Sequence, residues 1–325
     1  MLSTAATGPP PAESWKPVSH KTAVRAITKL SPFSPLQLIA MAFSPSLRAA
    51  AIFALFSIST INAVALDVNR RASNMVPDYE VKLLMNPTAV LGSDFKLTPA
   101  VLSTFSIPTS VTKMNVQYLD TDAKDIYNAG WSPRIRKKEG DSTFELNYKK
   151  RYDITNDDID GALTTANGEG FDSSSSYDAQ IEWGYQKKTL SISKDKSYSG
   201  SGYSGMDSPS KKDSRKMLID EAPDKFNDWL SNDWGTTQLG NSRIYGPILA
   251  KRSIGTWNGL ELYIEVWPIK NAAGTGTEYI VEASFKTTSR TTASSQHDAL
   301  ITLLQTKGWF LAQDSLKTSL IMQRY

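Results

Sequence analysis

The feature that most constrains the fold of this chain is a strict alternation of charged and apolar residues. In residues 76–84, "VPDYEVKLL", every second position is charged: Asp78, Glu80 and Lys82. Successive side chains of a β-strand point to opposite faces, so these charges share one face and the apolar residues between them share the other. The pattern predicts a strand with one charged and one apolar face.

The same period of two recurs along most of the chain. It predicts strands over residues 79–85, 113–119, 132–138, 143–150, 179–193, 248–254, 260–268, 279–287 and 316–323. These segments are too many and too long for a helical protein. The chain is therefore expected to belong to the α+β class with a large, mainly antiparallel sheet.

Helices are expected to be fewer. One opens at Thr98 with Pro99 in its first turn, and two others cover residues 216–230 and 295–307. The stretches 156–176 and 194–212 are rich in Ser, Gly, Asp or Lys and are expected to form long exposed loops. No internal repeat or long linker divides residues 78–325, which are expected to form one domain.

Residues 41–65, "MAFSPSLRAAAIFALFSISTINAVA", have the layout of a secretory signal peptide. Arg48 precedes an apolar run from Ala49 to about Ile61, and small residues end the segment at Ala65. The run is too short to span a bilayer comfortably. We expect Met41 to be the true start, residues 1–40 to be a gene-model extension or disordered, and residues 66–77 to be a short propeptide-like or linker segment. The mature protein would be secreted.

Charge and cysteine content exclude several classes of function. The chain has 36 Lys and Arg against 33 Asp and Glu, and removal of residues 1–65 leaves 31 against 32, so bulk charge favours neither a nucleic-acid nor a membrane partner. Cysteine is absent, which excludes disulfides and thiol catalysis. The one histidine after residue 65, His297, is expected to have an exposed structural role near the start of the last helix, so a histidine-based triad is not expected.

Several of the expected strands carry charges on one face only. The groups are Arg134, Arg136 and Lys138; Glu145, Asn147 and Lys149; Glu261, Tyr263 and Glu265; Glu282, Ser284 and Lys286; and Lys317 with Ser319. One interpretation is a sheet whose charged face is solvated. The other is a closed barrel, apolar outside and lined by both signs of charge inside. Its carboxylates would suit Mg²⁺ or Mn²⁺ and its Arg and Lys would suit phosphate, so it would bind a metal-polyphosphate.

Two stretches carry a resemblance to a known family. Residues 78–82 resemble the Glu-x-Glu-x-Lys signature of the CYTH, or triphosphate tunnel metalloenzyme, superfamily. Residues 116–150, "VQYLDTDAKDIYNAGWSPRIRKKEGDSTFELNYKK", are similar to the family's next block, which is matched by Tyr118, Asp120, Thr121, Gly130, Arg134, Arg136 and Lys149. The resemblance is looser over residues 248–325. It implies a closed or nearly closed eight-stranded antiparallel β-barrel, a tunnel with helices packed outside.

The resemblance also implies a role for individual residues. The implied metal ligands are Asp78, Glu80, Glu265 and Glu282; the implied phosphate contacts are Lys82, Arg134, Arg136, Lys149, Arg252 and Lys317; and the implied catalytic residues are Glu80, Lys82 and Glu282. Lys251 is an alternative to Arg252, and Glu261 is an alternative to Glu265. Two departures matter: Asp78 is one methylene shorter than the usual Glu, and Ser284 stands where the family often has a second acid.

Two functions follow from this reading. The first is a secreted phosphohydrolase that uses Mg²⁺ or Mn²⁺ and acts on triphosphate, polyphosphate or a related phosphorylated substrate. The second is a non-catalytic secreted protein on the same fold that binds a polyanion or another partner. Ser284 favours the second, because loss of an acid weakens the case for a second metal, whereas the Arg and Lys set is compatible with both. Neither function predicts a nucleic-acid partner or a stable membrane span.

Overall fold

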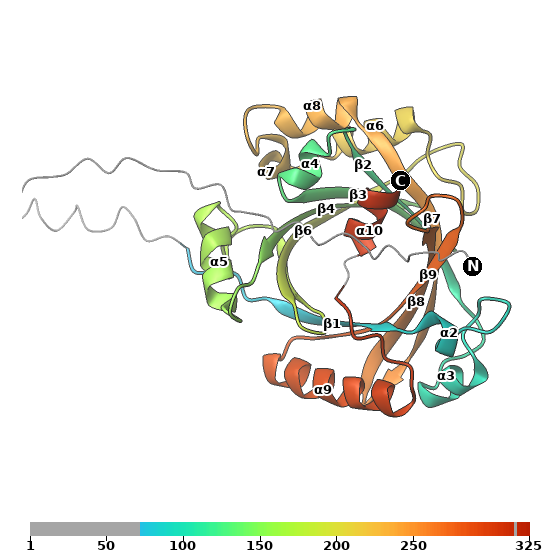
Figure 1. Ribbon diagram of the computed structural model, residues 1–325. Helices are drawn as coiled ribbons and strands as arrows, with labels where there is room; N and C mark the ends of the chain where they lie inside the picture. Colours follow the sequence, from blue (N-terminus) through green and yellow to red (C-terminus); the bar gives the residue numbers. More distant parts are fainter. Residues whose placement is uncertain (1–71, 315–316) are drawn as a thin grey trace, which may run out of the picture. The chain divides into compact units, whose positions relative to one another are not determined.

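Nine strands close into a barrel in the order β1-β5-β6-β4-β3-β2-β7-β8-β9 (Figure 1). The structure is a computed structural model that describes residues 72–314 and 317–325. The predicted segments 1–40 and 41–65, and residues 66–71 of the segment 66–77, lie outside these residues. The strands are β1 (Asp78–Met85), β2 (Thr112–Asp120), β3 (Trp131–Lys138), β4 (Phe144–Asp153), β5 (Asp178–Trp183), β6 (Lys188–Tyr198), β7 (Arg243–Trp257), β8 (Leu260–Lys270) and β9 (Thr277–Thr287).

The barrel closes through β1, which pairs on one side with β9 and on the other with β5. The pairing with β9 is antiparallel over seven residue pairs, and the pairing with β5 is parallel over four. Every other neighbouring pair is antiparallel. The closed barrel and the α+β class are confirmed, with nine strands in place of the eight expected.

The ninth strand comes from the segment 179–193, which was predicted as one strand. The chain reverses there, and the Gly184 amide donates to the Lys187 carbonyl at 2.8 Å. The two halves pair with each other as β5 and β6. A turn of this size interrupts the alternation by only a few residues, so the pattern along the sequence continues almost unbroken across it.

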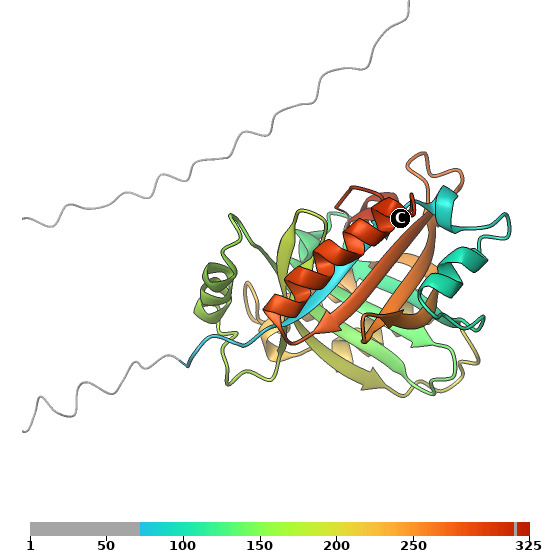
Figure 2. The same ribbon diagram turned by 90° about the horizontal axis from the view of Figure 1, so that it is seen from below.

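Helices cover the outside of the barrel (Figures 1 and 2). The longest, α9 (Arg290–Thr306), lies against β1 and β9; Ser289 caps its first turn by accepting from the Thr292 amide. The others outside are α2 (Pro87–Val90), α3 (Pro99–Thr104), α4 (Asp125–Asn128), α5 (Ile159–Gly168), α6 (Lys211–Asp220), α7 (Asp224–Asn227) and α8 (Trp234–Asn241).

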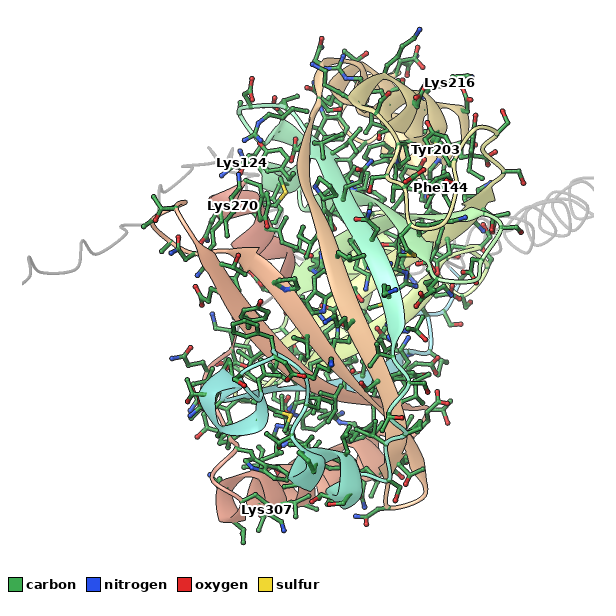
Figure 3. The ribbon with its side chains drawn as sticks, turned by 90° about the vertical axis from the view of Figure 1, so that its right-hand side faces the viewer. Lys124, Phe144, Tyr203, Lys216, Lys270 and Lys307 are labelled. Carbon is green, nitrogen blue, oxygen red and sulfur yellow. The ribbon has the colours of Figure 1, made fainter. Side chains whose placement is uncertain are left out.

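The apolar faces of the strands point outward, under these helices. Val81 and Leu83 of β1 are fully buried there, as is Trp131 of β3, whose ring packs edge-to-face on Phe226 at 5.3 Å. Burial of this layer is the main source of stability for a chain without disulfides. Figure 3 shows Phe144 beside Tyr203 at the edge of this layer. The charged faces therefore point into the barrel.

The last described element corrects a prediction. Residues 316–323 were expected to form a strand, but Lys317–Arg324 is a helix, α10. Its buried residues, Thr318, Ile321 and Met322, have the spacing of one helical face rather than of a strand. Ile321 and Met322 pack on inward-facing apolar residues near one end of the barrel, including Leu84 and Ile280. The helix thus packs inside one end of the barrel.

Four smaller predictions are also corrected. The helix expected over 216–230 is two helices, α6 and α7, with Pro223 preceding the second. The expected loop 156–176 contains α5, and the expected loop 194–212 contains the end of β6 and the start of α6. His297 is buried within α9 instead of exposed, and its ring forms a hydrogen bond with the Gly184 carbonyl at 2.9 Å.

Within the described residues, no helix is long and apolar enough to cross a membrane.

Candidate active site inside the barrel

The inward side chains line a cavity of about 410 Å³. The described residues contribute eight carboxylates and eight cations to its lining. The carboxylates are Asp78, Glu80, Glu145, Asp178, Glu182, Asp195, Glu265 and Glu282; the cations are Lys82, Arg134, Arg136, Lys149, Arg151, Arg252, Lys286 and Lys317. All ten residues predicted for the site are among them. The structure therefore brings these residues to one space, and their individual roles stay predictions.

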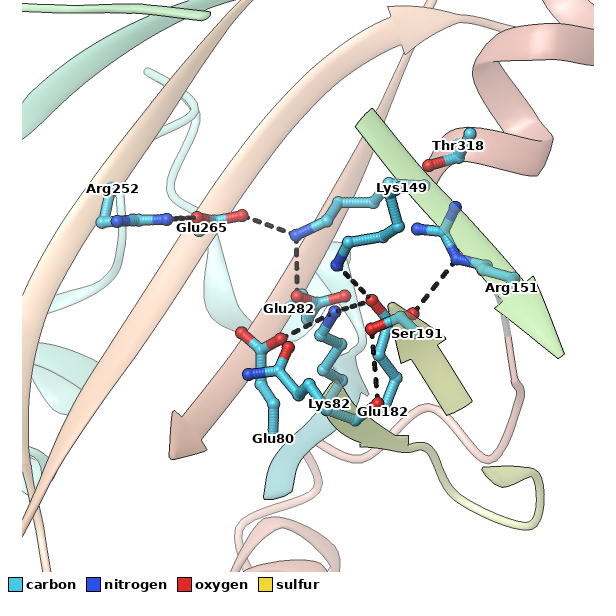
Figure 4. Close-up of polar contacts among 12 residues, drawn as sticks. Glu80, Lys82, Lys149, Arg151, Glu182, Ser191, Arg252, Glu265, Glu282 and Thr318 are labelled. Carbon is cyan, nitrogen blue, oxygen red and sulfur yellow. Dashed lines mark hydrogen bonds and ion pairs between the residues drawn. The ribbon is translucent and has the colours of Figure 1, made fainter. Parts of the chain in front are cut away.

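Glu182 of β5 is the centre of one ion-pair cluster (Figure 4). One of its carboxylate oxygens lies 2.8 Å from Lys149 Nζ and 3.3 Å from Lys82 Nζ, and the other lies 3.4 Å from Arg151 Nε. Lys82 also pairs with Glu80 at 2.9 Å. The Glu182 side chain is only 2% exposed, so one nearly dry carboxylate faces three cations.

Burial and charge compete in this cluster. Burial favours the protonated form of Glu182, but Lys149, Lys82 and Arg151 outweigh it and hold the pKa of the carboxyl well below its usual range. Burial also opposes the charge on Lys82, yet Glu182 and Glu80 raise the pKa of this ammonium. For Lys149 burial prevails, and its pKa falls to about 8. One carboxylate cannot fully compensate three buried cations.

A second cluster joins Glu265 of β8 and Glu282 of β9, which lie directly opposite each other in the sheet. The Lys317 ammonium, carried by α10, donates to both carboxylates, at 2.5 and 2.7 Å. Arg252 donates to Glu265 from Nε at 2.9 Å and from Nη2 at 2.6 Å, and the Trp267 indole donates to its other oxygen at 2.8 Å.

The pKa values of the two carboxyls in this cluster shift in opposite directions. Burial would protonate Glu265, but Lys317 and Arg252 outweigh it and lower its pKa. Glu282 has fewer cationic partners, so burial prevails and its pKa is raised. Glu265 and Glu282 share the Lys317 ammonium, so the space between the two carboxylates has a negative potential that favours a cation.

A third cluster is formed by Arg134 and Arg136 of β3, both paired with Glu145 of β4. The distance from Arg134 Nη2 to Glu145 is 3.0 Å. Burial lowers the pKa of Arg136, next to the like charge of Arg134. The Nε donors of both arginines are buried and have no hydrogen-bond partner among the described residues. Buried donors without partners are costly, so an acceptor inside the tunnel would be bound favourably.

Of the residues that the sequence left as alternatives, only one of each pair lines the cavity among the described residues. Arg252 and Glu265 line the cavity and pair with each other. Lys251 lies on the opposite face of β7, and Glu261 is exposed and accepts from the Tyr263 hydroxyl. Asp78 lies at the mouth of the cavity, where its side chain is exposed.

Glu182, Arg151 and Glu145 are the central tunnel residues to which sequence analysis assigned no role. A signal for Glu182 was present, because Asp178, Gln180 and Glu182 alternate with apolar residues in "DAQIEW". The segment was interpreted as part of one long strand, so this face was not compared with the others.

One end of the barrel is bordered by exposed strand residues, and the other holds α10. Asp78, Thr256, Glu261 and Lys286 are exposed at one end, which forms an open mouth. The opposite end holds α10. Beyond Lys82, Glu182 and Glu282, a second cavity of about 330 Å³ continues beside α10; its other lining residues include Asp153, Lys187, Gln313, Asp314 and Ser319.

The carboxylates fit a hard divalent cation by donor type. Among the described residues, no group of three or more His, Asp or Glu side chains is arranged to hold a metal ion alone. Mg²⁺, however, is commonly held by one or two carboxylates, with waters and substrate phosphates completing its shell. Glu265 and Glu282 supply such a pair around the position of the Lys317 ammonium. The donor set therefore fits a cation that binds together with a phosphorylated ligand.

No family model and no curated protein matches the chain. Among solved structures, it is similar to a candidate adenylyl cyclase from Hippeastrum with a dominant triphosphatase activity, at 15% identity and a TM-score of 0.42 over 74% of this chain and 93% of that one. It is also similar to a candidate adenylate cyclase from Bacillus halodurans, at 13% identity and a TM-score of 0.43 over 77% and 97% of the two chains. Similarities at this level establish neither family nor activity. The closed barrel, with both signs of charge on its inner wall, is the architecture that the resemblance of residues 78–82 and 116–150 implied.

Proposed function

We propose that the chain is a metal-dependent phosphohydrolase that acts on triphosphate, polyphosphate or a related phosphorylated substrate inside the tunnel. One observation carries the proposal: Arg134 and Arg136 line the cavity, and their buried Nε donors have no hydrogen-bond partner among the residues that the structure describes. Phosphate oxygens are the acceptors that guanidinium groups bind best, through several parallel hydrogen bonds.

Different tunnel residues would bind the phosphate chain and the metal ion. Arg134, Arg136 and Arg252 would hold phosphate oxygens, and Lys82, Lys149 and Lys317 would offset the negative charge along the phosphate chain. Glu265 and Glu282 would hold Mg²⁺ or Mn²⁺, with Glu80 nearby on β1. The cation supplies charge neutralisation at phosphate and activation of water for attack. The enclosing strands limit access of bulk water, which strengthens each electrostatic contact.

The charge balance of the tunnel supports a need for the cation. Eight carboxylates already offset the eight cations of the lining. Entry of a polyphosphate therefore adds negative charge to an interior that has no excess of positive charge. A divalent cation that enters with the substrate restores the balance, whereas a purely basic cleft would not need one.

The second candidate is a protein that binds a phosphate-rich ligand without hydrolysing it. Ser284, nearly buried on the inner wall, favours this reading, because a hydroxyl is a weaker cation ligand than the acid the family often has there. In both cases we propose that the protein is secreted, on the basis of residues 41–65. N-terminal sequencing of exported protein tests this, and a mature end upstream of Met41 would contradict it.

The deciding experiment measures phosphate release from tripolyphosphate, longer polyphosphate and nucleoside triphosphates with Mg²⁺, Mn²⁺ or EDTA. Turnover is expected only with a cation, and Glu282→Gln is expected to abolish it. Arg136→Ala should weaken binding by roughly 1.5–3 kcal/mol, the value of a hydrogen bond to a charged group. Lys251→Ala is the matched control, because Lys251 lies on the outer face beside Arg252. It should change neither turnover nor phosphate affinity. Tight binding in EDTA with no release under any condition would reject hydrolysis in favour of the binding function.

A further inference from the structure

A third cavity, of about 480 Å³, lies where β1 ends and α2 begins, at the end of the barrel that holds α10 (Figure 1). Its lining comes from four parts of the chain: residues between 84 and 95, the start of β9, the segment 311–313 and α10. Among the described residues, it shares no lining residue with the tunnel cavity. We call this space the apolar cavity.

The described lining of the apolar cavity offers apolar surface and no unpaired charge. Leu91, Leu311 and Leu320 lie on it and are only half-buried, so part of their apolar surface is uncovered by the described residues. Glu278 and Arg324 are the only charged side chains of the described lining, and they pair with each other at 2.6 Å. An ion would find no free counter-charge there, whereas an uncharged apolar molecule gains by covering the leucines.

Two stacked aromatic rings form one side of the apolar cavity. The ring centres of Phe95 and Tyr279 are 4.3 Å apart, and the planes of the rings differ by 9°. Phe95 is 48% exposed and has a φ of 57°, in the left-handed region that a bulky residue rarely adopts. A tight turn holds it there, since its amide donates to the Gly92 carbonyl at 3.0 Å. The backbone is thus strained at the residue whose ring borders the cavity, as is common at ligand sites.

The volume of the apolar cavity sets the size of the molecule that fits it. An apolar cavity of about 150 Å³ holds one benzene molecule. The apolar cavity has about three times that volume. It also lies within the range of about 300–1,000 Å³ that is common for small-molecule sites with mainly apolar walls. The molecule that fits is therefore an uncharged one of roughly three linked six-membered rings.

The apolar cavity adjoins the candidate active site through α10 and β1. Leu320 lies on the next turn of α10 after Lys317. Leu84, on the cavity wall, pairs across the sheet with Glu282. A molecule in contact with Leu320 buries more of α10, so its binding stabilises the helix that carries the Lys317 ammonium.

We propose that the apolar cavity is a second ligand site, which binds an uncharged, largely apolar molecule between the Phe95–Tyr279 pair and Leu320. The bound molecule stabilises α10 in the position that places Lys317 at the carboxylates of the tunnel. The inference goes beyond the proposed function and does not depend on it, because the cavity has no role in phosphate chemistry.

Two fluorescent probes with the same ring skeleton test the proposal. N-phenyl-1-naphthylamine is uncharged, and 1-anilinonaphthalene-8-sulfonate is the same skeleton with one added sulfonate. With the full chain, the uncharged probe should bind saturably and about tenfold more tightly than the sulfonate, because burial of a charge without a partner is costly. Tripolyphosphate with Mg²⁺ should not displace the uncharged probe, although it would displace a probe bound in the tunnel.

Variants of two cavity residues locate the bound probe. Phe95→Ala removes one ring of the stacked pair and should weaken binding of N-phenyl-1-naphthylamine about fivefold. Thr88→Trp introduces an indole from an exposed position on the cavity wall and should weaken binding by more than about tenfold, because it fills the space. Leu249→Ala is the matched control, because Leu249 is 44% exposed, close to the 48% of Phe95, and does not line the cavity. It should leave the affinity unchanged, and far-ultraviolet circular dichroism should show that all three variants are folded.

Amide hydrogen exchange tests the effect on α10. At ten times its Kd, N-phenyl-1-naphthylamine should slow exchange in α10 by up to about tenfold. Exchange in α5, which does not line the cavity, should stay unchanged. If exchange in α10 is unchanged while the probe is bound, the stabilisation of α10 is wrong.

Four results would overturn the ligand site itself: no saturable binding of the uncharged probe, equal or tighter binding of the sulfonate, displacement by tripolyphosphate, or unchanged affinity in both cavity variants. None of these measurements depends on phosphate release. The proposed function therefore stands or fails separately, in its own experiment.

Discussion

At the scale of single residues, Glu182 is the carboxylate on which three buried cations of the tunnel depend for charge compensation. Its carboxylate is nearly dry and contacts three cations. Removal of one partner from a buried ion pair is more harmful than loss of the pair, because the remaining charge has no solvent. For Lys149, burial outweighs the attraction of Glu182 and lowers the pKa of the ammonium to about 8. The charge of Lys149 therefore changes within about one pH unit of neutrality.

Phosphate affinity is expected to fall as the pH rises through about 8. The charged form of Lys149 prevails below this pKa and the neutral form above it, and a bound phosphate favours the charged form. For one linked proton the loss is at most about tenfold for each pH unit above the pKa. Calorimetric titration with tripolyphosphate from pH 6.5 to 9.5 would measure it.

Lys149→Arg separates this effect from titration of the ligand. Arginine stays protonated throughout this range, so the variant should show a flatter profile above pH 8. Lys251→Arg changes a lysine on the outer face and should keep the wild-type profile. A profile for Lys149→Arg that matches the wild type would show that another group controls the pH dependence.

At the scale of elements, α10 brings to the site a residue that no strand supplies. The helix places Lys317 between Glu265 and Glu282, while Ile321 and Met322 pack on the inward apolar residues. Further contacts hold it: Ser319 bonds to the Tyr127 hydroxyl at 2.7 Å, and Arg324 pairs with Glu278 at 2.6 Å. The position of the Lys317 ammonium thus depends on apolar packing one turn away.

Ile321→Ala should loosen α10 without unfolding the barrel. Ile321 is fully buried, and truncation of such a side chain costs on the order of 2–4 kcal/mol. Because α10 adds no strand to the sheet, we expect the loss to appear mainly as local opening. Amide hydrogen exchange should accelerate within α10 and stay slow in β1 and β8. Gln323→Ala, at an exposed position of the same helix, should leave exchange unchanged. Equal acceleration in α10 and the strands would contradict this.

At the scale of the whole molecule, barrel closure joins the first and the last strand of the described chain. The first strand, β1, pairs with β9, the last in sequence, and the sheet has no free edge. Loss of either strand would expose two edges and open the charged interior. The barrel should therefore unfold as one unit, because no part of it keeps a complete core alone.

Urea unfolding is expected to show a single transition with the same midpoint by far-ultraviolet circular dichroism and by tryptophan fluorescence. The fluorescent residues sample different parts of the barrel: Trp131 in β3, Trp183 in β5, Trp257 in β7 and Trp267 in β8. Tripolyphosphate with Mg²⁺ at a hundred times its Kd should raise the free energy of unfolding by about 2.7 kcal/mol. A fluorescence transition that precedes loss of the strands would show separable units.

The sequence by itself determined most of the strands, their two-faced character and the shared face of Arg134 and Arg136. It could do so because the alternation of side chains is a local property of an extended chain, readable within a few residues. The same rule could have identified Glu182. The resemblance added the closed barrel, which the pattern alone left open between a tunnel and a solvated sheet.

Only the tertiary structure decided which face is enclosed and which residues meet. Selection of Glu265 over Glu261 depends on register between strands, since both lie on the inner face of β8 and differ in depth. The parallel pairing of β1 with β5, which places Glu182 beside Lys82, joins segments about a hundred residues apart. The helical form of α10 depends on an apolar site inside the barrel, which exists only after closure. Local periodicity contains no information on such distant pairings, because they are set by the packing of the whole chain.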